Sequence, residues 1–395
     1  MSHPPGATVV ARAELAGVPR WTRAFAEQRK DHRYYEIVED TIPGFDYRYI
    51  VVADSGGTVC AVQPCFILDQ DLLQGAGSRV GAVAAWVRRW WPRFMYLRTL
   101  MVGCAAGAAR VDADAASAPA AMELLAAALP AVARGLGTPL VVLKEFPARH
   151  RAALACFRRA GFACIPSMPA TLLSISYASF DDYMSRALSG KMRKDLRRKS
   201  RAAERSAPIE MSVIDDIGTV IDEVYPLYLA VYERSKLRFE KLTKNYFSRL
   251  GRDMPDKVRF FIWRQNGRIV AFTLCMIEGD TLYGEYVGFD YAIALDLHLY
   301  HYAFRDVVTW AIANGFKTFG STGLNYDPKL HLRHRLDPLD LYVKHTSPFF
   351  NALLKRLLPL LEPTRQEKIL RKFPNYDELW NRTTEDGGRR TDKAE

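Results

Sequence analysis

Cysteine is scarce in this chain and irregularly spaced. Six cysteines occur in 395 residues, with no CxxC pair and no histidine spaced to complete a zinc site with them. They stand at positions 60, 65, 104, 156, 164 and 275. The spacing gives no sign of a metal site, and we expect the cysteines to be small buried side chains of a protein from a reducing cytosol.

Long apolar runs are also missing. The least polar long stretch, residues 115–133, is mostly alanine and contains Pro119, Glu123 and Pro130, which make it a poor membrane span. The first residues, MSHPPGATVVARAEL, lack the charged start and apolar core of a secretory signal. We therefore expect a soluble, cytoplasmic protein.

The chain does carry an excess of positive charge. Its 55 Lys and Arg residues against 44 Asp and Glu give a formal charge of +11 at pH 7. Such an excess favours anionic partners, among them phosphorylated cofactors, acidic proteins, nucleic acid and acidic lipid headgroups. A length of 395 residues is enough for two domains, each with its own core.

Hydrophobic periodicity predicts a similar order of elements in both halves. In the first half it predicts a hairpin at 47–66 and strands at 96–104, 139–144 and 171–176, with helices between the strands. In the second half it predicts a hairpin at 258–278 around Asn266-Gly267, then a strand, a helix and a strand over 281–321. This order predicts a mixed α/β fold with two similar domains. Their expected limits are 1–178 and 179–346, followed by an amphipathic helix and a polar tail at 347–395.

The unit at 281–323 is the expected centre of the chemistry. Two parallel strands joined by a helix place the end of the first strand next to the helix N-terminus, where free backbone N–H groups favour a phosphate. The pattern therefore predicts an anionic cofactor lying across this sheet.

Four segments carry a family resemblance. They are SGKMRKDLRRKSRAAER from Ser189, PLYLAVYERSKLRFEKLT from Pro226, YVGFDYAIALDLHLYHYAFRDVVTWAIANG from Tyr286 and YDPKLHLRHRLDPLDLYVKH from Tyr326. In these segments the chain resembles the FemAB-like group of tandem acyltransferases in the GNAT superfamily. The resemblance implies two tandem GNAT-like domains, and transfer of an acyl group from acyl-CoA or acyl carrier protein to an amine, with no tightly bound cofactor. The glycine-rich pyrophosphate loop usual in GNAT proteins is missing after Gly288, so individual CoA-binding residues cannot be carried across.

Transfer to an amine requires a group that accepts the ammonium proton, donors for the oxyanion and an acid for the leaving thiolate. The resemblance places these groups at the end of the strand 281–288, near Glu285, Tyr286 and Asp290. Alternation along a strand puts Glu285 and Tyr286 on opposite faces, so we expect only one of them to face a ligand. Glu285 fits an exposed edge charge equally well, and Asp290 fits a helix cap.

The next helix adds Tyr300 and His301, which fall on its apolar face near the expected cofactor. A lone histidine on such a face is more often a hydrogen-bonded core residue than a catalyst. Our catalytic candidates are Glu285, Asp290, His301 and Tyr300. Our candidates for binding the cofactor are Tyr286, Gly288, Tyr326, Lys329, Arg193 and Arg197.

Arg193 and Arg197 belong to a run of eight basic residues between 191 and 205. The structural interpretation is a solvated helix between domains. The functional interpretations are a site for the CoA 3′-phosphate, for acyl carrier protein, for tRNA or for a membrane. We do not expect nucleic acid to be the main target, because the run has no interleaved aromatics.

Two other segments combine apolar and basic residues. WVRRWWPRF, from Trp86, alternates aromatics with arginines, and residues 349–361 form an apolar stripe beside Lys355 and Arg356. Core packing explains both, and Pro359 and Pro363 favour it for the stripe. The alternative is peripheral contact with an anionic membrane, on the inner membrane for a cytoplasmic protein. That contact would suit a lipid amine such as a sphingoid base, the acceptor of bacterial ceramide synthases, which resemble this group.

Two further functions stay open. One is FemAB-like transfer of an amino acid from aminoacyl-tRNA to a peptidoglycan precursor, although the chain lacks the coiled-coil arm of some such enzymes. The other is a non-catalytic protein that binds acyl-CoA or an acyl carrier, which the missing glycine-rich loop permits.

Overall fold

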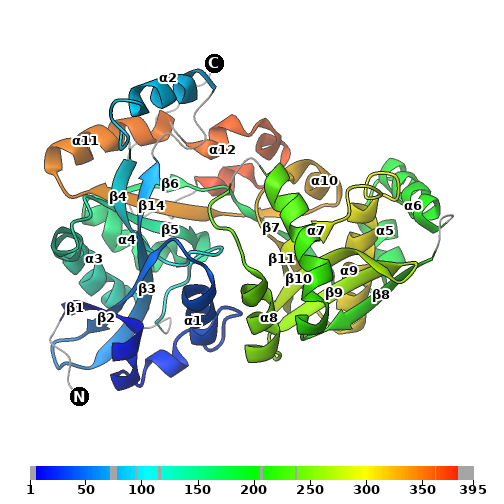
Figure 1. The fold of residues 1–395 in the computed structure, drawn as a ribbon, viewed down its shortest axis with the longest axis horizontal. Coiled ribbons are helices and arrows are strands. Elements are labelled where there is room, and N and C mark those ends of the chain that lie inside the picture. The colour runs from blue at the N-terminus through cyan, green and yellow to red at the C-terminus, as the bar shows by residue number, and fades with distance from the viewer. Residues whose placement is uncertain are drawn as a thin grey trace.

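The protein consists of two seven-stranded mixed sheets, each covered by helices on both faces (Figure 1). The computed structural model describes residues 6–71, 78–94, 96–113, 117–204, 208–235, 238–360 and 362–380. Within these ranges the predicted α/β class with two similar halves is confirmed.

The first sheet has the strand order β1-β2-β3-β4-β5-β14-β6. Helices α3 and α4 cover one face through an alanine- and leucine-rich cluster, and α1 packs on the other. The strands are β1 (Gly6–Val10), β2 (Asp46–Ala53), β3 (Val59–Asp71), β4 (Tyr96–Val102), β5 (Leu140–Pro147), β6 (Ala163–Pro166) and β14 (Leu339–His345). The helices are α1 (His32–Thr41), α2 (Ser78–Arg88), α3 (Ala118–Gly135) and α4 (Arg151–Arg159).

The second sheet has the order β13-β7-β12-β11-β10-β9-β8. Helices α5, α6 and α9 lie on one face, and α7 and α8 lie on the other. The strands are β7 (Ala170–Ser174), β8 (Ile209–Ile214), β9 (Val258–Gln265), β10 (Arg268–Glu278), β11 (Thr281–Phe289), β12 (Thr318–Ser321) and β13 (Arg335–Asp337). The helices are α5 (Phe180–Ala187), α6 (Gly190–Glu204), α7 (Ile221–Arg234), α8 (Lys244–Asp253), α9 (Leu299–Ala313) and α10 (Tyr326–His331).

Both predicted hairpins are present. β2 pairs with β3, and β9 pairs with β10 around Asn266 and Gly267, whose φ angles of 52° and 77° are those of a two-residue hairpin turn. After β14 the chain continues through α11 (Pro348–Leu357) and α12 (Pro363–Gln366). Among the described residues, no helix is long and apolar enough to cross a membrane.

Each sheet is completed by a strand from the other half of the chain. β7 follows the first set of strands in sequence, yet it lies between β12 and β13 of the second sheet. β14 follows the second set, yet it lies between β5 and β6 of the first sheet. The expected strand at 171–176 therefore exists, but it joins the other sheet. No single cut near residue 178 separates the two sheets.

The two halves also share one hydrophobic cluster. It joins α1 of the first half to α7 and α8 of the second. At its centre the hydroxyls of Tyr34 and Tyr246 lie 2.9 Å apart, and both side chains are fully buried. Through this shared core, one face of each sheet packs toward the other half of the protein. The candidate site lies beside this core.

Candidate active site

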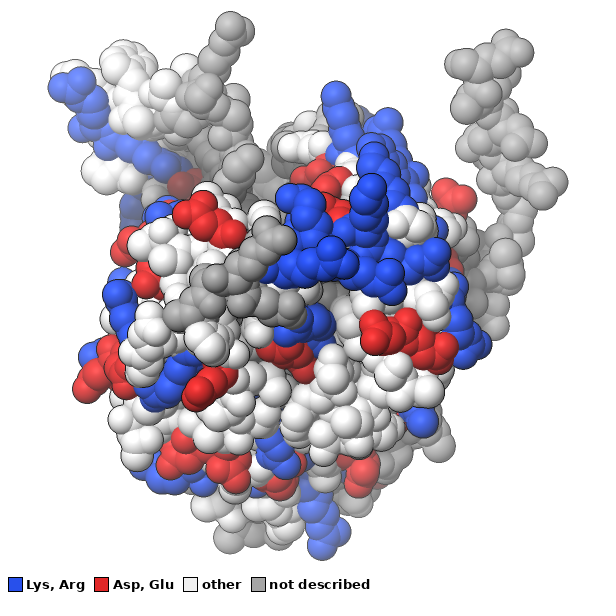
Figure 2. Space-filling view, turned by 90° about the vertical axis from the view of Figure 1, so that its right-hand side faces the viewer, with Lys and Arg blue, Asp and Glu red and all other residues white. Residues whose placement is uncertain are grey.

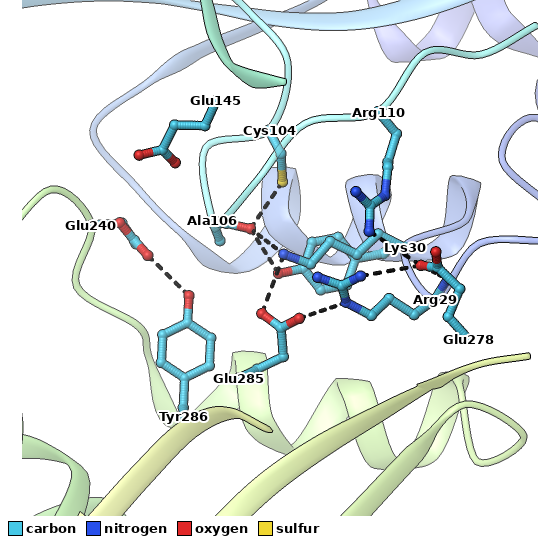
Figure 3. A network of polar contacts seen from close by, with 12 residues as sticks. Arg29, Lys30, Cys104, Ala106, Arg110, Glu145, Glu240, Glu278, Glu285 and Tyr286 are labelled. Atoms are coloured by element: carbon cyan, nitrogen blue, oxygen red, sulfur yellow. Dashed lines mark hydrogen bonds and ion pairs between the residues drawn. The ribbon is translucent and has the colours of Figure 1, made fainter. Parts of the chain in front are cut away.

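An irregularity in β11 brings Glu285 and Tyr286 to the same side of the sheet. Leu274 and Cys275 are consecutive in β10, but their partners in β11 are Tyr286 and Gly284, so Glu285 is an extra residue in β11. Both side chains point toward the N-terminal half (Figure 3). The expectation that strand alternation separates them was wrong, because a β-bulge interrupts the alternation at this position.

The same strand extends beyond the end of its parallel neighbour. β11 and β12 pair only from Thr281 to Gly284, opposite Thr318 to Ser321, although β11 continues to Phe289. Beyond Gly284, the outer edge of β11 has no strand partner among the described elements. In the first sheet β5 likewise extends beyond the end of β4, but there the Ala109 amide donates to the carbonyl of Glu145 (3.1 Å), so a loop covers this edge.

Glu285 is held by two cations from the segment before α1. Arg29 Nε lies 2.6 Å from Oε1 and Lys30 Nζ lies 3.4 Å from Oε2. Lys30 also donates to the carbonyl of Ala106 (3.0 Å). Burial opposes ionisation of Glu285, but the two cations prevail and lower its pKa to about 2. A carboxylate in this state is a weak proton acceptor and joins the two halves of the protein.

A second carboxylate extends this network. Glu278, at the end of β10, lies 3.1 Å from Arg29, 3.3 Å from Arg110 and 3.5 Å from Arg149. The Arg29 guanidinium also stacks on the ring of Tyr283, 3.7 Å from its centroid. Burial opposes ionisation of Glu278, yet the surrounding guanidinium groups hold its pKa below the usual range.

Glu240 has the opposite character. It lies in the connection between α7 and α8, and its Oε1 accepts a hydrogen bond from the Tyr286 hydroxyl (2.9 Å). Burial raises the pKa of Glu240, although Lys144 and the bond from Tyr286 act in the other direction. The side chain is still only half-buried, so solvent reaches it. A carboxyl that solvent reaches and whose pKa is raised is a better proton acceptor than an ordinary carboxylate.

Across from Glu240, the first half contributes Lys144 and Glu145. Their side chains form a 2.9 Å ion pair, in which Lys144 also donates to the carbonyl of Gly107 (3.2 Å). Burial opposes ionisation of Glu145, but Lys144 stabilises the ionised carboxylate and holds the pKa of Glu145 below the usual range. Figure 3 shows Glu145, Glu240 and Glu285 arranged around the space between β11 and the loop of Cys104 and Ala106.

Sequence reasoning missed Glu240, Arg29, Lys30, Lys144 and Glu145. Glu240 stands in a segment that carries the family resemblance, but a connecting loop has no periodicity that would single out one carboxylate. Arg29 and Lys30 are distant in sequence from β11, and only the packing of the two halves brings them to it.

The other catalytic candidates lie elsewhere. The carboxylate of Asp290 accepts from the Ala292 amide (3.0 Å) and pairs with Arg268 (3.1 Å), so it stabilises the turn after β11, whereas His298 is the residue at the N-cap of α9. Tyr300 and His301 are half-buried on α9, which packs on the opposite face of the sheet from Glu240 and contacts α6. Burial lowers the pKa of His301 to about 4, so this imidazole is neutral at pH 7.

The candidates for cofactor binding do not form one site either, because several of them are buried and already have partners within the protein. A Cβ on Gly288 would lie 2.7 Å from the Leu227 carbonyl carbon, so this glycine lets α7 pack against β11. Tyr326 is buried and donates to the carbonyl of Pro169 (2.8 Å). Lys329 is buried and donates to the carbonyls of Thr322 (2.5 Å) and Leu324 (2.9 Å), and burial lowers its pKa to about 7.

The predicted basic helix is α6. Arg193 donates to the carbonyls of Ser185 (2.7 Å) and Leu188 (3.3 Å), whereas Arg197 is exposed. Leu196 is buried, and the helix contacts α9. Figure 2 shows Lys and Arg side chains gathered into one patch on the face of the second half. The patch therefore lies over the helix that follows β11.

Comparison with known proteins gives one family match and a set of structural likenesses. A FemAB-like family model, described as peptidoglycan biosynthesis/recognition, matches residues 89–330, more than half of the chain. No curated protein matches the sequence significantly.

Three solved structures illustrate the structural likenesses. FemX has 12% identity and a TM-score of 0.49, with 78% of this chain and 90% of FemX covered. L-PGS from Bacillus licheniformis has 13% identity and a TM-score of 0.48, with 85% and 97% covered. A tandem GNAT protein from the clavulanic acid biosynthesis pathway has 12% identity and a TM-score of 0.47, with 87% and 99% covered. Likenesses of this size do not identify an activity. None of these findings supports the expected relation to ceramide synthases.

Proposed function

Since the chain belongs to the FemAB-like family of peptidoglycan biosynthesis and recognition proteins, with two tandem GNAT-like domains, we propose that it transfers an acyl group from an activated carrier to an amine. The observation that carries the proposal is the hydrogen-bonded pair of Glu240 and Tyr286 beside the edge of β11 that extends beyond β12. The pair supplies a proton acceptor of raised pKa next to a strand edge that can bind an extended ligand.

The residues support the following sequence of steps. Glu240 accepts one proton from the acceptor ammonium, and the neutral amine attacks the carbonyl carbon of the donor. A C–N bond forms, and backbone N–H groups at the edge of β11 stabilise the oxyanion. The carbon–sulfur bond of a thioester donor then breaks, and the thiolate takes the second proton from the nitrogen. Tyr286 holds the Glu240 carboxyl in place throughout.

The carboxylates around this space favour a cationic acceptor. Glu145, Glu240 and Glu285 come from both halves, and Lys30 and Arg29 already neutralise Glu285. Lys144 likewise pairs with Glu145, so Glu240 is the carboxyl that remains to attract an ammonium group. An amine acceptor fits this balance of charge better than an anionic one.

For the donor we propose an acyl thioester, carried by CoA or by acyl carrier protein and bound as a co-substrate. The basic patch on α6 supports this choice, because α6 contacts α9 and α9 begins shortly after β11. A thioester held along β11 would have its anionic end within reach of Arg197 and its neighbours. Arg193 already bonds to carbonyls, so Arg197 is the stronger candidate for a phosphate.

The second candidate is transfer from an aminoacyl-tRNA, the FemAB-like alternative. The family match and the basic patch favour it about as strongly as they favour a thioester. The chemistry at Glu240 would be unchanged, with an ester oxygen leaving in place of sulfur. A lipid amine such as a sphingoid base remains one of several acceptors for either donor.

The test is thiol release by the purified protein from acetyl-, octanoyl- and palmitoyl-CoA, each with sphingoid bases, amino acids and polyamines, with products identified by mass spectrometry. A parallel reaction offers aminoacyl-tRNA with peptidoglycan precursors. We expect amide formation in one of the two reactions and none with Glu240→Gln. Binding of acyl-CoA without turnover in any mixture would contradict the proposal and favour a non-catalytic binding protein.

A further inference from the structure

Two exposed segments leave the first sheet at the same end. The register pairs Asp71 with Tyr96, Thr99 with Leu140, and Leu140 with His345. α2 lies between β3 and β4, so it stands at this end of the sheet, and α11 begins at Pro348, just after His345. Figure 1 shows both helices along the upper rim of the first half.

These segments hold most of the exposed apolar side chains of the described protein. Eleven large hydrophobic side chains are exposed, and nine of them lie between residues 83 and 96 or on α11. Of these nine, the most exposed are Trp90 (83%) and Phe349 (74%). We call the nine side chains the aromatic rim: Val83, Trp86, Trp90, Trp91, Tyr96, Phe349, Phe350, Leu353 and Leu357.

The packing expected for the C-terminal stripe accounts for little of this surface. Only Leu354 and Leu358 pack against the core, both partly buried, and no residue of α11 is fully buried. In α2 and the turn after it, Ala84 is the one fully buried residue among those whose side chains are described. An apolar surface of this kind on a soluble protein marks a site of contact with another molecule.

The charged residues within the two segments that carry the aromatic rim are all basic, although Asp69 and Asp71 of the neighbouring β3 pair with Arg93 and Arg88. Residues 82–94 and 348–359 contain no Asp or Glu, and Arg89, Arg93, Lys355 and Arg356 are exposed. Arg93 is paired with Asp69, but its side chain remains 80% exposed. Tryptophan beside arginine and lysine, without acidic residues, is the composition of a surface that lies in the interface of an anionic bilayer.

We propose that the aromatic rim docks the protein on an anionic phospholipid membrane. The Trp and Phe side chains enter the headgroup region while the flanking Arg and Lys side chains bind lipid phosphates. This inference concerns where the protein acts and holds for either donor considered above. It differs from the basic patch on α6, where the exposed side chains between residues 191 and 201 are charged and none of them is a large apolar one.

The experiment is flotation of the full-length protein with vesicles of phosphatidylglycerol and phosphatidylcholine, compared with phosphatidylcholine alone. We expect binding to the anionic vesicles, with a blue shift of tryptophan emission. The double variant Trp90→Ser/Phe349→Ser should reduce binding by about tenfold or more, because both side chains contribute buried apolar area. Lys355→Glu/Arg356→Glu should weaken binding to anionic vesicles alone.

Two matched controls separate this surface from others. Leu295→Ser removes an equally exposed leucine (75%) from the second half, and Lys194→Glu/Arg197→Glu reverses charge on α6. Both should bind vesicles as the unchanged protein does. The proposal is overturned if the unchanged protein does not float, if the Trp90 and Phe349 double variant floats normally, or if only the α6 variant loses binding. Self-association that the double variant abolishes, without vesicle binding, would instead make the rim a dimer interface. Vesicle binding does not depend on turnover, so it can fail or succeed independently of the transfer reaction.

Discussion

Tyr286 donates a hydrogen bond to Glu240 across 2.9 Å, and this bond joins the bulged strand of the second sheet to the connection between α7 and α8. Burial raises the pKa values of both groups, so the phenol stays protonated and the carboxyl holds its proton more tightly than in water. The neighbouring Glu285 has a pKa lowered to about 2 by Arg29 and Lys30. Two adjacent residues of β11 are therefore associated with carboxyl groups whose pKa values shift in opposite directions. Tyr286 bonds to Glu240, whose pKa is raised, and Glu285 has a lowered pKa of its own. Of these two carboxyl groups, only Glu240 has a raised pKa, which makes it the stronger proton acceptor.

Glu240→Gln should lower kcat/KM for amide formation by roughly 10²–10⁴-fold, the usual contribution of a general base. The amide oxygen can still accept from Tyr286, so the fold is retained. A raised folded pKa favours the protonated carboxyl, so this group contributes stability below its unfolded pKa that is lost as pH rises through the folded pKa. Replacing it with a neutral amide should therefore leave stability at pH 7 unchanged or higher.

The measurement is steady-state kinetics against pH together with urea unfolding at pH 7. In the unchanged enzyme activity should fall as pH drops through the raised pKa of Glu240, and the variant should lose this acidic limb. Glu233→Gln, on the exposed surface of α7, is the matched control and should alter neither measurement. Loss of activity with parallel unfolding would contradict a catalytic role.

Glu285→Gln should destabilise the protein by about 3–5 kcal/mol, because it leaves Arg29 and Lys30 buried without their anionic partner. The folded pKa of about 2 is below the ordinary 4.5, so the stability from this carboxylate is complete above pH 4.5 and is lost as pH falls toward 2. Urea unfolding at pH 7 and pH 3.5 measures both effects. Glu210→Gln on the exposed surface of β8 is the control. If Glu285→Gln keeps full stability, the carboxylate does not hold the two halves together.

Sequence reasoning reached the elements of this fold more readily than its connections. The hairpin at Asn266 and Gly267 and the helix α9 follow from local pattern, which acts over a few residues. The exchange of β7 and β14 does not, because either strand has the same apolar alternation whichever sheet it joins. β7 pairs with β12 because the edge of β12 is free in the assembled second sheet. Which strand edges are free depends on the fold of the whole chain and not on the local sequence.

The site was predictable in part for the same reason. The unit 281–323 was correctly predicted as two parallel strands joined by a helix, because its strand and helix periods are clear. The bulge at Glu285 has no local signal, so alternation gave the wrong face for one of two adjacent residues. Arg29 and Lys30 become partners of Glu285 only through the shared core around Tyr34 and Tyr246.

Gly288→Ala tests whether this glycine serves packing or a cofactor. Its Cβ would lie 2.3 Å from Phe272 and 2.7 Å from the Leu227 backbone, so β11 and α7 must move apart. We expect a loss of about 1–3 kcal/mol of stability, as for other overpacked cores. Gly284→Ala is the comparison, because its nearest neighbour would be the Phe319 ring at 3.2 Å, and it should cost less. Thermal unfolding of both variants distinguishes the two roles of Gly288. Normal stability of Gly288→Ala together with weakened acyl-CoA binding would favour the cofactor role.

Lys329 should make stability depend on pH above neutrality. Burial lowers its folded pKa to about 7 from the ordinary 10.5, so between these values the unfolded chain holds a proton that the folded chain has released. Stability therefore rises as pH increases from 7 toward 10.5, and the cost of burying the charge is complete below 7. Lys329→Met should remove this rise and stabilise the protein at pH 7. Comparing urea midpoints of the two proteins at pH 7 and 9.5 cancels the other titrating groups, and equal slopes would show that Lys329 does not titrate in this range.

The exchanged strands predict how the protein responds to cleavage. A fragment of residues 1–178 would lack β14, which pairs with both β5 and β6, so the first sheet would be split and two strand edges exposed. A fragment of residues 179–395 would lack β7, which separates β12 from β13. We expect each fragment alone to aggregate or to give weak circular dichroism, and the two expressed together to form a soluble complex that purifies through a tag on either one. A control break at residue 267, in an exposed hairpin turn, should leave a soluble nicked protein, because it separates no strand from its sheet. Independent folding of residues 1–178 would mean that β14 contributes little to the stability of the first sheet.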